Sequence, residues 1–122
     1  MSPREVITRY YELANQGDWE AWTDLFTPDL VMDEQLAGHI EGQDALRSIM
    51  RGFPAMYASF ANRPKHILVD GDQAAVVSRI EATTSAGDTI EADVVNYFRL
   101  DGDHIAYLAN FHDTVPFRAL AS

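Results

Sequence analysis

Cysteine is absent from this chain of 122 residues, and basic residues are scarce. Without cysteine the protein can form no disulfide, no thiolate nucleophile and no cysteine-ligated zinc or iron–sulfur cluster. Nine Lys and Arg residues against nineteen Asp and Glu residues give a formal net charge of −10. That charge repels phosphate backbones, so we expect no nucleic-acid partner. The sequence also lacks HExxH and other metal-ligand spacings, so we expect no metal site.

Long apolar runs are missing as well. No stretch approaches the roughly 20 residues that a membrane-spanning helix needs, and the N-terminus lacks the basic and apolar regions of a signal peptide. We therefore expect a cytoplasmic protein with no membrane association. What remains is an ordinary globular composition, 47% hydrophobic and 23% charged, in a length that suits a single domain over residues 1–122.

The first half of the chain carries helix signals. Ser2-Pro3-Arg4-Glu5 is a capping box with proline at the first helical position, and apolar residues then recur at helical spacing. A second helix is expected over the apolar stripe that contains Trp19 and Trp22, which we interpret as core or interface anchors. A third helix should begin near Gln43 and end or kink at Pro54.

The second half alternates between apolar and polar residues, as half-buried strands do. Gly-Asp and Asp-Gly-Asp sequences separate the alternating runs and favour hairpin turns. Strands are expected over residues 66–69, 74–84, 89–100 and 104–113, after a short strand over 30–34 and a loop over 35–42. This order predicts an α+β fold in which three N-terminal helices pack on one face of a curved antiparallel sheet and enclose a cone-shaped cavity. Residues 117–122 are expected to be a tail.

One face of the expected strand over 89–100 is apolar except at Asn96. A buried amide costs about 1–3 kcal/mol unless a partner hydrogen-bonds to it. Asn110 and His112 follow the same alternation in the next strand. Polar groups that converge on an apolar face are typical of a small-molecule pocket. The alternative for Asn96 is a partner within the protein that only sets the strand register.

Three stretches together resemble the SnoaL-like and ketosteroid-isomerase-like members of the nuclear transport factor 2 superfamily. They are RYYELANQGDWEAWTDLF, TPDLVMDE and LDGDHIAYLANFHD, and they match the opening helix pair, the first strand and the last hairpin of those proteins. The resemblance covers nearly the whole chain and implies their cystatin-like fold. It does not select a reaction, because this fold hosts enzymes, binding proteins and dimerisation domains.

The resemblance also implies a catalytic set. Tyr10 falls at the place of the isomerases' oxyanion-donating tyrosine, Glu34 at that of their aspartate base, and Asn96 at that of their second oxyanion donor. These roles imply proton-transfer chemistry on a hydrophobic carbonyl compound (isomerisation, cyclisation or dehydration) with no cofactor. Glu34 is preferred to Glu81 as the base because the cation of Arg79 weakens a nearby carboxylate as a base. The other residues expected to bind the substrate are Met32, Phe53, Tyr57, Leu108, Asn110 and His112.

Other interpretations stay open. SnoaL-like cyclases carry an acid/base aspartate where this chain has Asn110, so the acid/base group of their mechanism is missing at this position. Arg79-Ile80-Glu81 resembles the arginine–aspartate pair of limonene epoxide hydrolases, although an exposed or dimer-facing ion pair is the simpler interpretation. A non-catalytic ligand-binding or dimerisation module would instead hold Asn96 and Asn110 by protein groups inside a filled cavity.

The opposite face of the last two expected strands is apolar too. Val95, Tyr97, Tyr107, Ala109 and Phe111 would form a patch that a monomer does not comfortably expose. Two such sheets packed back to back would bury it, so we expect a homodimer through the outer face of the sheet. The other expected partner is a small hydrophobic ligand in the cavity.

Overall fold

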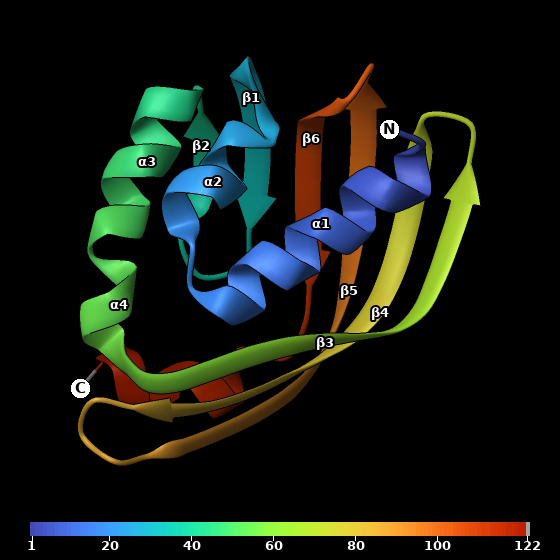
Figure 1. The fold of residues 1–122 in the computed structure, drawn as a ribbon. Helices are drawn as coiled ribbons and strands as arrows, with labels where there is room; N and C mark the ends of the chain where they lie inside the picture. The colour runs from blue at the N-terminus through green and yellow to red at the C-terminus, as the bar shows by residue number, and fades with distance from the viewer. Residues whose placement is uncertain (122) are drawn as a thin grey trace.

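The computed structural model of the protein describes residues 1–121 and consists of one curved sheet with helices against its inner face (Figure 1). The expected α+β architecture is confirmed. The helices are α1 (Pro3–Gln16), α2 (Trp19–Asp24), α3 (Gln43–Arg51), α4 (Phe53–Met56) and the 3₁₀ helix η1 (Val115–Ala121). The strands are β1 (Phe26–Glu34), β2 (Gly38–Glu41), β3 (Tyr57–Asp70), β4 (Gln73–Thr84), β5 (Thr89–Asp101) and β6 (His104–Phe111).

The helix α1 starts and stops where its sequence signals predict. The Ser2 hydroxyl accepts a hydrogen bond from the Glu5 amide at 3.2 Å, and the Glu5 carboxylate accepts one from the Ser2 amide at 3.3 Å, which completes the capping box. Gly17 ends the helix with φ at 72°, a left-handed conformation that glycine adopts without strain. The apolar side of α1 is buried against the sheet and supplies much of the main core.

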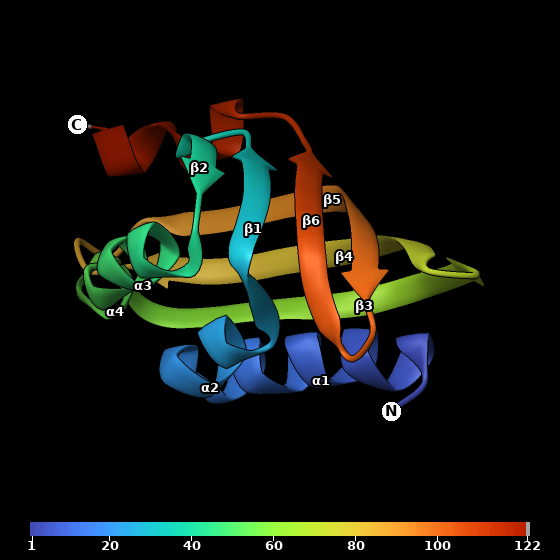
Figure 2. The same cartoon turned by 90° about the horizontal axis from the view of Figure 1, so that it is seen from above.

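The sheet has the strand order β2-β1-β6-β5-β4-β3. Neighbouring strands are antiparallel except for β1 and β6, which run parallel. The long strands β3, β4 and β5 bend strongly (Figure 1), and α1 runs along β3 (Figure 2). Every second residue of β5 from Ile90 to Leu100 is buried, as the alternation predicts. A smaller apolar cluster lies where β4 and β5 meet η1.

Several expected boundaries were wrong. The strand expected over 30–34 begins at Phe26, and the strand expected over 104–113 ends at Phe111. The strand expected over 66–69 begins at Tyr57 instead, because Pro64 sits in an edge strand, which tolerates proline, and a register shift at that point breaks the alternation. The loop expected over 35–42 contains the short strand β2. The expected tail is the helix η1 over most of its length, because Phe117 is an apolar side chain that buries itself in the second cluster; Ser122 lies outside the described residues.

No helix among residues 1–121 is both long enough and apolar enough to cross a membrane.

Candidate functional site

A cavity of about 480 Å³ lies between the helices and the inner face of the sheet. Its walls are mostly apolar and include residues of α3, α4 and η1, which gather at one end of the sheet (Figure 2). This volume is within the range of small-molecule sites, about 300–1,000 Å³. Every residue of the predicted site lines this one cavity: Tyr10, Met32, Glu34, Phe53, Tyr57, Asn96, Leu108, Asn110 and His112.

Glu34 is held at the end of β1 by donors on both carboxylate oxygens. Its Oε2 accepts hydrogen bonds from the backbone amides of Leu36, at 2.8 Å, and of Ala37 in the turn that leads to β2. Its Oε1 accepts one from Asn110 Nδ2 at 3.3 Å, while Asn110 Oδ1 accepts one from the Gln35 amide at 2.9 Å. The parallel pairing of β1 with β6 brings Asn110 beside Glu34. Asn110 therefore positions the carboxylate.

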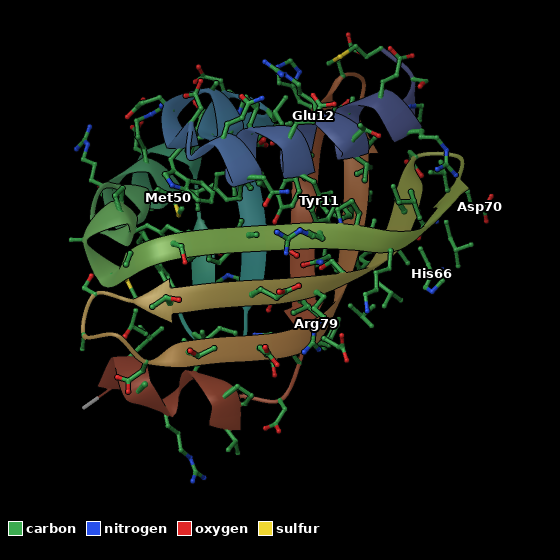
Figure 3. The ribbon with its side chains drawn as sticks, turned by 60° about the horizontal axis from the view of Figure 1, so that its bottom comes forward. Tyr11, Glu12, Met50, His66, Asp70 and Arg79 are labelled. Carbon is green, nitrogen blue, oxygen red and sulfur yellow. The ribbon has the colours of Figure 1, made fainter. Side chains whose placement is uncertain are left out.

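Asn96 belongs to a separate buried network. Its Nδ2 donates to Tyr11 Oη at 2.9 Å and to Ser78 Oγ at 3.0 Å. Burial raises the pKa of Tyr11, so its phenol stays protonated. Figure 3 shows Tyr11 between α1 and the sheet. Both Nδ2 hydrogens are thus engaged within the protein, and Asn96 in this orientation does not offer the free donor that the sequence predicted.

The two partners of Asn96 do not select one orientation of its amide. Hydroxyl groups donate as well as accept, so half a turn of the amide keeps both contacts, with Tyr11 and Ser78 then donating to Oδ1. In that orientation Nδ2 is the free atom of an amide that lines the cavity.

Tyr10 offers a free hydroxyl to the cavity. It is almost fully buried, and its hydroxyl makes no hydrogen bond to any residue in the described part of the chain. Burial raises the pKa of Tyr10, and the negative charge of Glu34 raises it further. The same two causes raise the pKa of Tyr57 to about 12. Both phenols are therefore protonated at neutral pH and able to donate a hydrogen bond.

Aromatic rings form the wall between α2 and β3. Trp19 packs edge-on against Phe53 with ring centroids 4.7 Å apart, and Phe53 lies 5.1 Å from Phe60 and 4.8 Å from Tyr57. The sequence interpretation of Trp19 as a core anchor missed its place in the cavity wall. Helical spacing alone does not distinguish a core position from a cavity position.

His112 lies near the end of the cavity that η1 closes. Its Nδ1 is 2.7 Å from the carbonyl oxygen of Asp113, which only accepts, so Nδ1 carries the hydrogen of this contact. Its ring centroid is 4.9 Å from that of Phe117. Phe117 and Leu120 also line the cavity. They were not predicted to do so, because residues 117–122 were interpreted as a tail.

Asn62 and Trp22 are polar cavity residues that the sequence analysis did not identify as such. Asn62 lines the cavity from β3, and its Oδ1 is buried with no hydrogen-bond partner among residues 1–121. Trp22 also lines the cavity, and its indole Nε1 is buried with no hydrogen-bond partner among residues 1–121. A polar residue on a buried strand face could have identified Asn62 as a cavity residue. That face can be assigned only when the start of β3 and its register shift are known.

Arg79 and Glu81 do not reach the cavity. Arg79 lies on the outer face of β4 (Figure 3), where it pairs with Glu91 at 3.1 Å and with Asp93 at 3.2 Å. Glu81 pairs instead with Arg63 at 3.0 Å. The pair that resembles the epoxide hydrolase residues therefore does not lie in the cavity, because Arg79 and Glu81 are on the outward-facing side of β4.

An exposed cluster lies behind the Glu34 turn. His39 Nδ1 is 2.6 Å from Asp33 Oδ1, and His39 Nε2 is 3.0 Å from Glu41 Oε1. Tyr107 donates to Asp33 Oδ2 at 2.6 Å. The pKa of His39 is raised by its hydrogen bonds to Asp33 and Glu41, so its protonated form links the paired strands β1 and β2. Within residues 1–121 no group of three or more His, Asp or Glu side chains is arranged to hold a metal ion.

Comparisons with known proteins agree with this architecture. The family model of the SnoaL-like domain matches residues 7–108, whereas a search of curated proteins gives no match. Among solved structures, an NTF2-like protein of unknown function from Burkholderia pseudomallei has a TM-score of 0.88 at 18% identity, with 98% of each chain covered.

Two further structures carry more specific names. TerC, co-crystallised with polyporic acid, has a TM-score of 0.86 at 22% identity and covers 99% of this chain and 100% of its own. IdmH from Streptomyces antibioticus, named as a candidate polyketide cyclase, has a TM-score of 0.82 at 23% identity, with 99% of each chain covered. At such identities the likeness shows a shared fold.

Proposed function

The chain belongs to the SnoaL-like domain family, and from this premise we propose that it is a small-molecule enzyme in which Glu34 moves a proton on a hydrophobic carbonyl compound. One observation carries the proposal: a carboxylate held by three donors and a free, protonated phenol line the same largely apolar cavity. The co-crystal of TerC with polyporic acid supports a small organic ligand for this fold.

The proposed reaction begins when Glu34 takes a proton from the carbon next to the substrate carbonyl. The electron pair of that C–H bond moves onto the carbonyl oxygen and forms an enolate. Tyr10 donates a hydrogen bond from its free hydroxyl to this oxygen, and Asn96 in its rotated orientation donates a second hydrogen bond. One such donor contributes about 10²–10³ in rate in other enzymes. Protonated Glu34 then returns the proton at another carbon, or to a leaving oxygen.

The walls of the cavity support this chemistry. Met32 and Leu108 line the cavity from the neighbouring strands β1 and β6, and Phe53 lines it from α4. An apolar lining lowers the local dielectric constant and so strengthens the hydrogen bonds to the enolate. The proposed substrate is therefore largely apolar, with a single carbonyl group near Glu34.

Proton abstraction can be tested without knowing the natural substrate. We would incubate the protein in D₂O with 2-tetralone or 1-indanone and follow deuterium incorporation next to the carbonyl by mass spectrometry. The wild-type protein should accelerate exchange above the buffer rate, and Glu34→Gln should not. Glu81→Gln is the matched control, because Glu81 lies on the outer face, and it should exchange at the wild-type rate. Equal exchange by wild type and Glu34→Gln would overturn Glu34 as the base.

A second candidate function is a non-catalytic ligand-binding module. It is favoured by the side chains of Asn96 and Asn110, which are both hydrogen-bonded within the protein. This candidate predicts that ketones bind with micromolar affinity but gain no deuterium. Calorimetric binding without exchange would therefore support the module over the enzyme.

We also propose that two copies pair through the outer face of the sheet. Val77, Val95 and Phe111 are 36%, 41% and 57% exposed and lie side by side on β4, β5 and β6. The charged side chains next to this row, three basic and three acidic, pair with one another. This face is thus locally neutral in a chain of net charge −10, so a second copy can approach it without the repulsion expected elsewhere.

A further inference from the structure

The amide of Asn62 is the polar group of the cavity that the proposed reaction leaves unused. The residue is 7% exposed and lines the cavity. Its Oδ1 is buried without a partner, and its Nδ2 donates to no residue in the described part of the chain. A buried amide without partners costs about 1–3 kcal/mol. A position that only filled the core would be better served by an apolar side chain of the same size.

The backbone of Asn62 is fixed more firmly than an edge strand requires. Asn15 near the end of α1 donates its Nδ2 to the Asn62 carbonyl at 2.9 Å and accepts from the Asn62 amide at 2.7 Å. These two bonds satisfy the backbone groups that β3, as an edge strand, turns away from β4. They also tie α1 to β3. The side chain of Asn62 therefore projects into the cavity from a rigid support.

Asn62 and Glu34 line the cavity from strands near opposite edges of the sheet. Glu34 lies on β1 and Asn62 on β3, with β6, β5 and β4 between these strands. A ligand that spans the cavity between these two strands contacts both residues. Because the sheet is curved (Figure 1), both residues line the same cavity.

We propose that Asn62 determines specificity by hydrogen-bonding a second polar group, at the end of the ligand remote from the one beside Glu34. This inference rests on the proposed function, because it requires a ligand in the cavity. A hydroxyl fits best, since it can donate to Oδ1 or accept from Nδ2 whichever way the amide is turned. The preferred ligands are then elongated apolar molecules with a polar group at each end.

The test uses two pairs of probes that differ by one hydroxyl at the far end. They are 2-naphthol with 2,6-dihydroxynaphthalene, and 4-phenylphenol with 4,4′-dihydroxybiphenyl, with affinities measured by isothermal titration calorimetry. In at least one pair, wild type should bind the diol about five- to tenfold more tightly, the value of one net hydrogen bond. Asn62→Leu should lose this preference and keep its affinity for the mono-alcohol.

Thermal unfolding separates a ligand contact from a structural role. Asn62→Leu removes an unpartnered amide, so its Tm should rise by about 3 °C or more. Thr27→Val is the matched control, because Thr27 Oγ1 is also buried without a partner among residues 1–121 but Thr27 does not line the cavity. It should raise Tm without changing the preference for the diol.

The outcomes distinguish the inference from its premise. A lower Tm for Asn62→Leu, an equal affinity of wild type for both members of each pair, or a diol preference that survives in Asn62→Leu would each overturn the role of Asn62 alone. Failure of all four compounds to bind wild type would overturn this role together with the proposed small-molecule function.

Discussion

The pairing of Glu34 with Asn110 leads to a prediction that needs no substrate. In Glu34→Gln, one carboxylate oxygen becomes an NH₂ group. If the remaining oxygen accepts from the backbone amides of Leu36 and Ala37, the new NH₂ group faces Asn110 Nδ2, which is also a donor. Turning the Asn110 amide would relieve this conflict but would break its 2.9 Å bond with the Gln35 amide. Every arrangement of the single variant loses at least one hydrogen bond.

The size of the effect follows from the type of bond that is lost. A hydrogen bond to a charged group contributes about 1.5–3 kcal/mol when buried, and this cluster is only partly buried. We therefore expect Glu34→Gln to lower the free energy of unfolding by about 1–2 kcal/mol. Asn110→Asp should be destabilised by at least as much at pH 7, because it places a second carboxylate within about 3.3 Å of the first.

The double variant Glu34→Gln/Asn110→Asp should recover most of the loss. The new amide at position 34 can donate to the new carboxylate at position 110, whose other oxygen still accepts from the Gln35 amide. Urea unfolding of the wild type and the three variants forms a double-mutant cycle, and we expect a coupling energy of about 1–3 kcal/mol between the two positions. Additive single effects, or an unchanged midpoint for Glu34→Gln, would refute the hydrogen-bond arrangement described here.

The remaining predictions concern the two tyrosines, the exposed histidine and the outer face. Tyr11→Phe should lower the free energy of unfolding by about 1–2 kcal/mol because it removes an acceptor of Asn96, whereas Tyr10→Phe should be nearly neutral in the same urea titration; equal losses would contradict the free hydroxyl of Tyr10. The raised pKa of His39 means that its contribution to stability is complete below about 6.5 and disappears as the pH rises through the folded value. His39→Gln should therefore reduce Tm at pH 5.5 and change it little at pH 9, and a pH-independent difference would exclude this linkage. Phe111→Asp should convert a dimer into a 13.7 kDa monomer in light scattering, and a wild-type protein that is itself monomeric at micromolar concentration would remove the proposed interface.

Much of the fold was determined by short-range sequence patterns. The capping box and Gly17 set the ends of α1, and the alternation in β5 set which side chains point inward. Such patterns depend on neighbours within a few residues, so they can be followed along the chain. Asn96 was recognisable for the same reason, as a polar residue in a regular apolar series that had to be accommodated inside the protein. The family resemblance added Tyr10 and Glu34 to the predicted site, and every residue of that predicted site lines one cavity.

Tertiary structure alone decided what the polar residues in the cavity do. The parallel contact of β1 with β6 makes Asn110 a partner of Glu34, and the network with Tyr11 engages one of the two polar atoms of the Asn96 amide. Asn62 was not predicted as a cavity residue, because the register shift in β3 interrupts the alternation that would have shown which face its side chain lies on. Hydrogen bonds between groups tens of residues apart depend on strand order and side-chain direction, and a linear pattern contains neither.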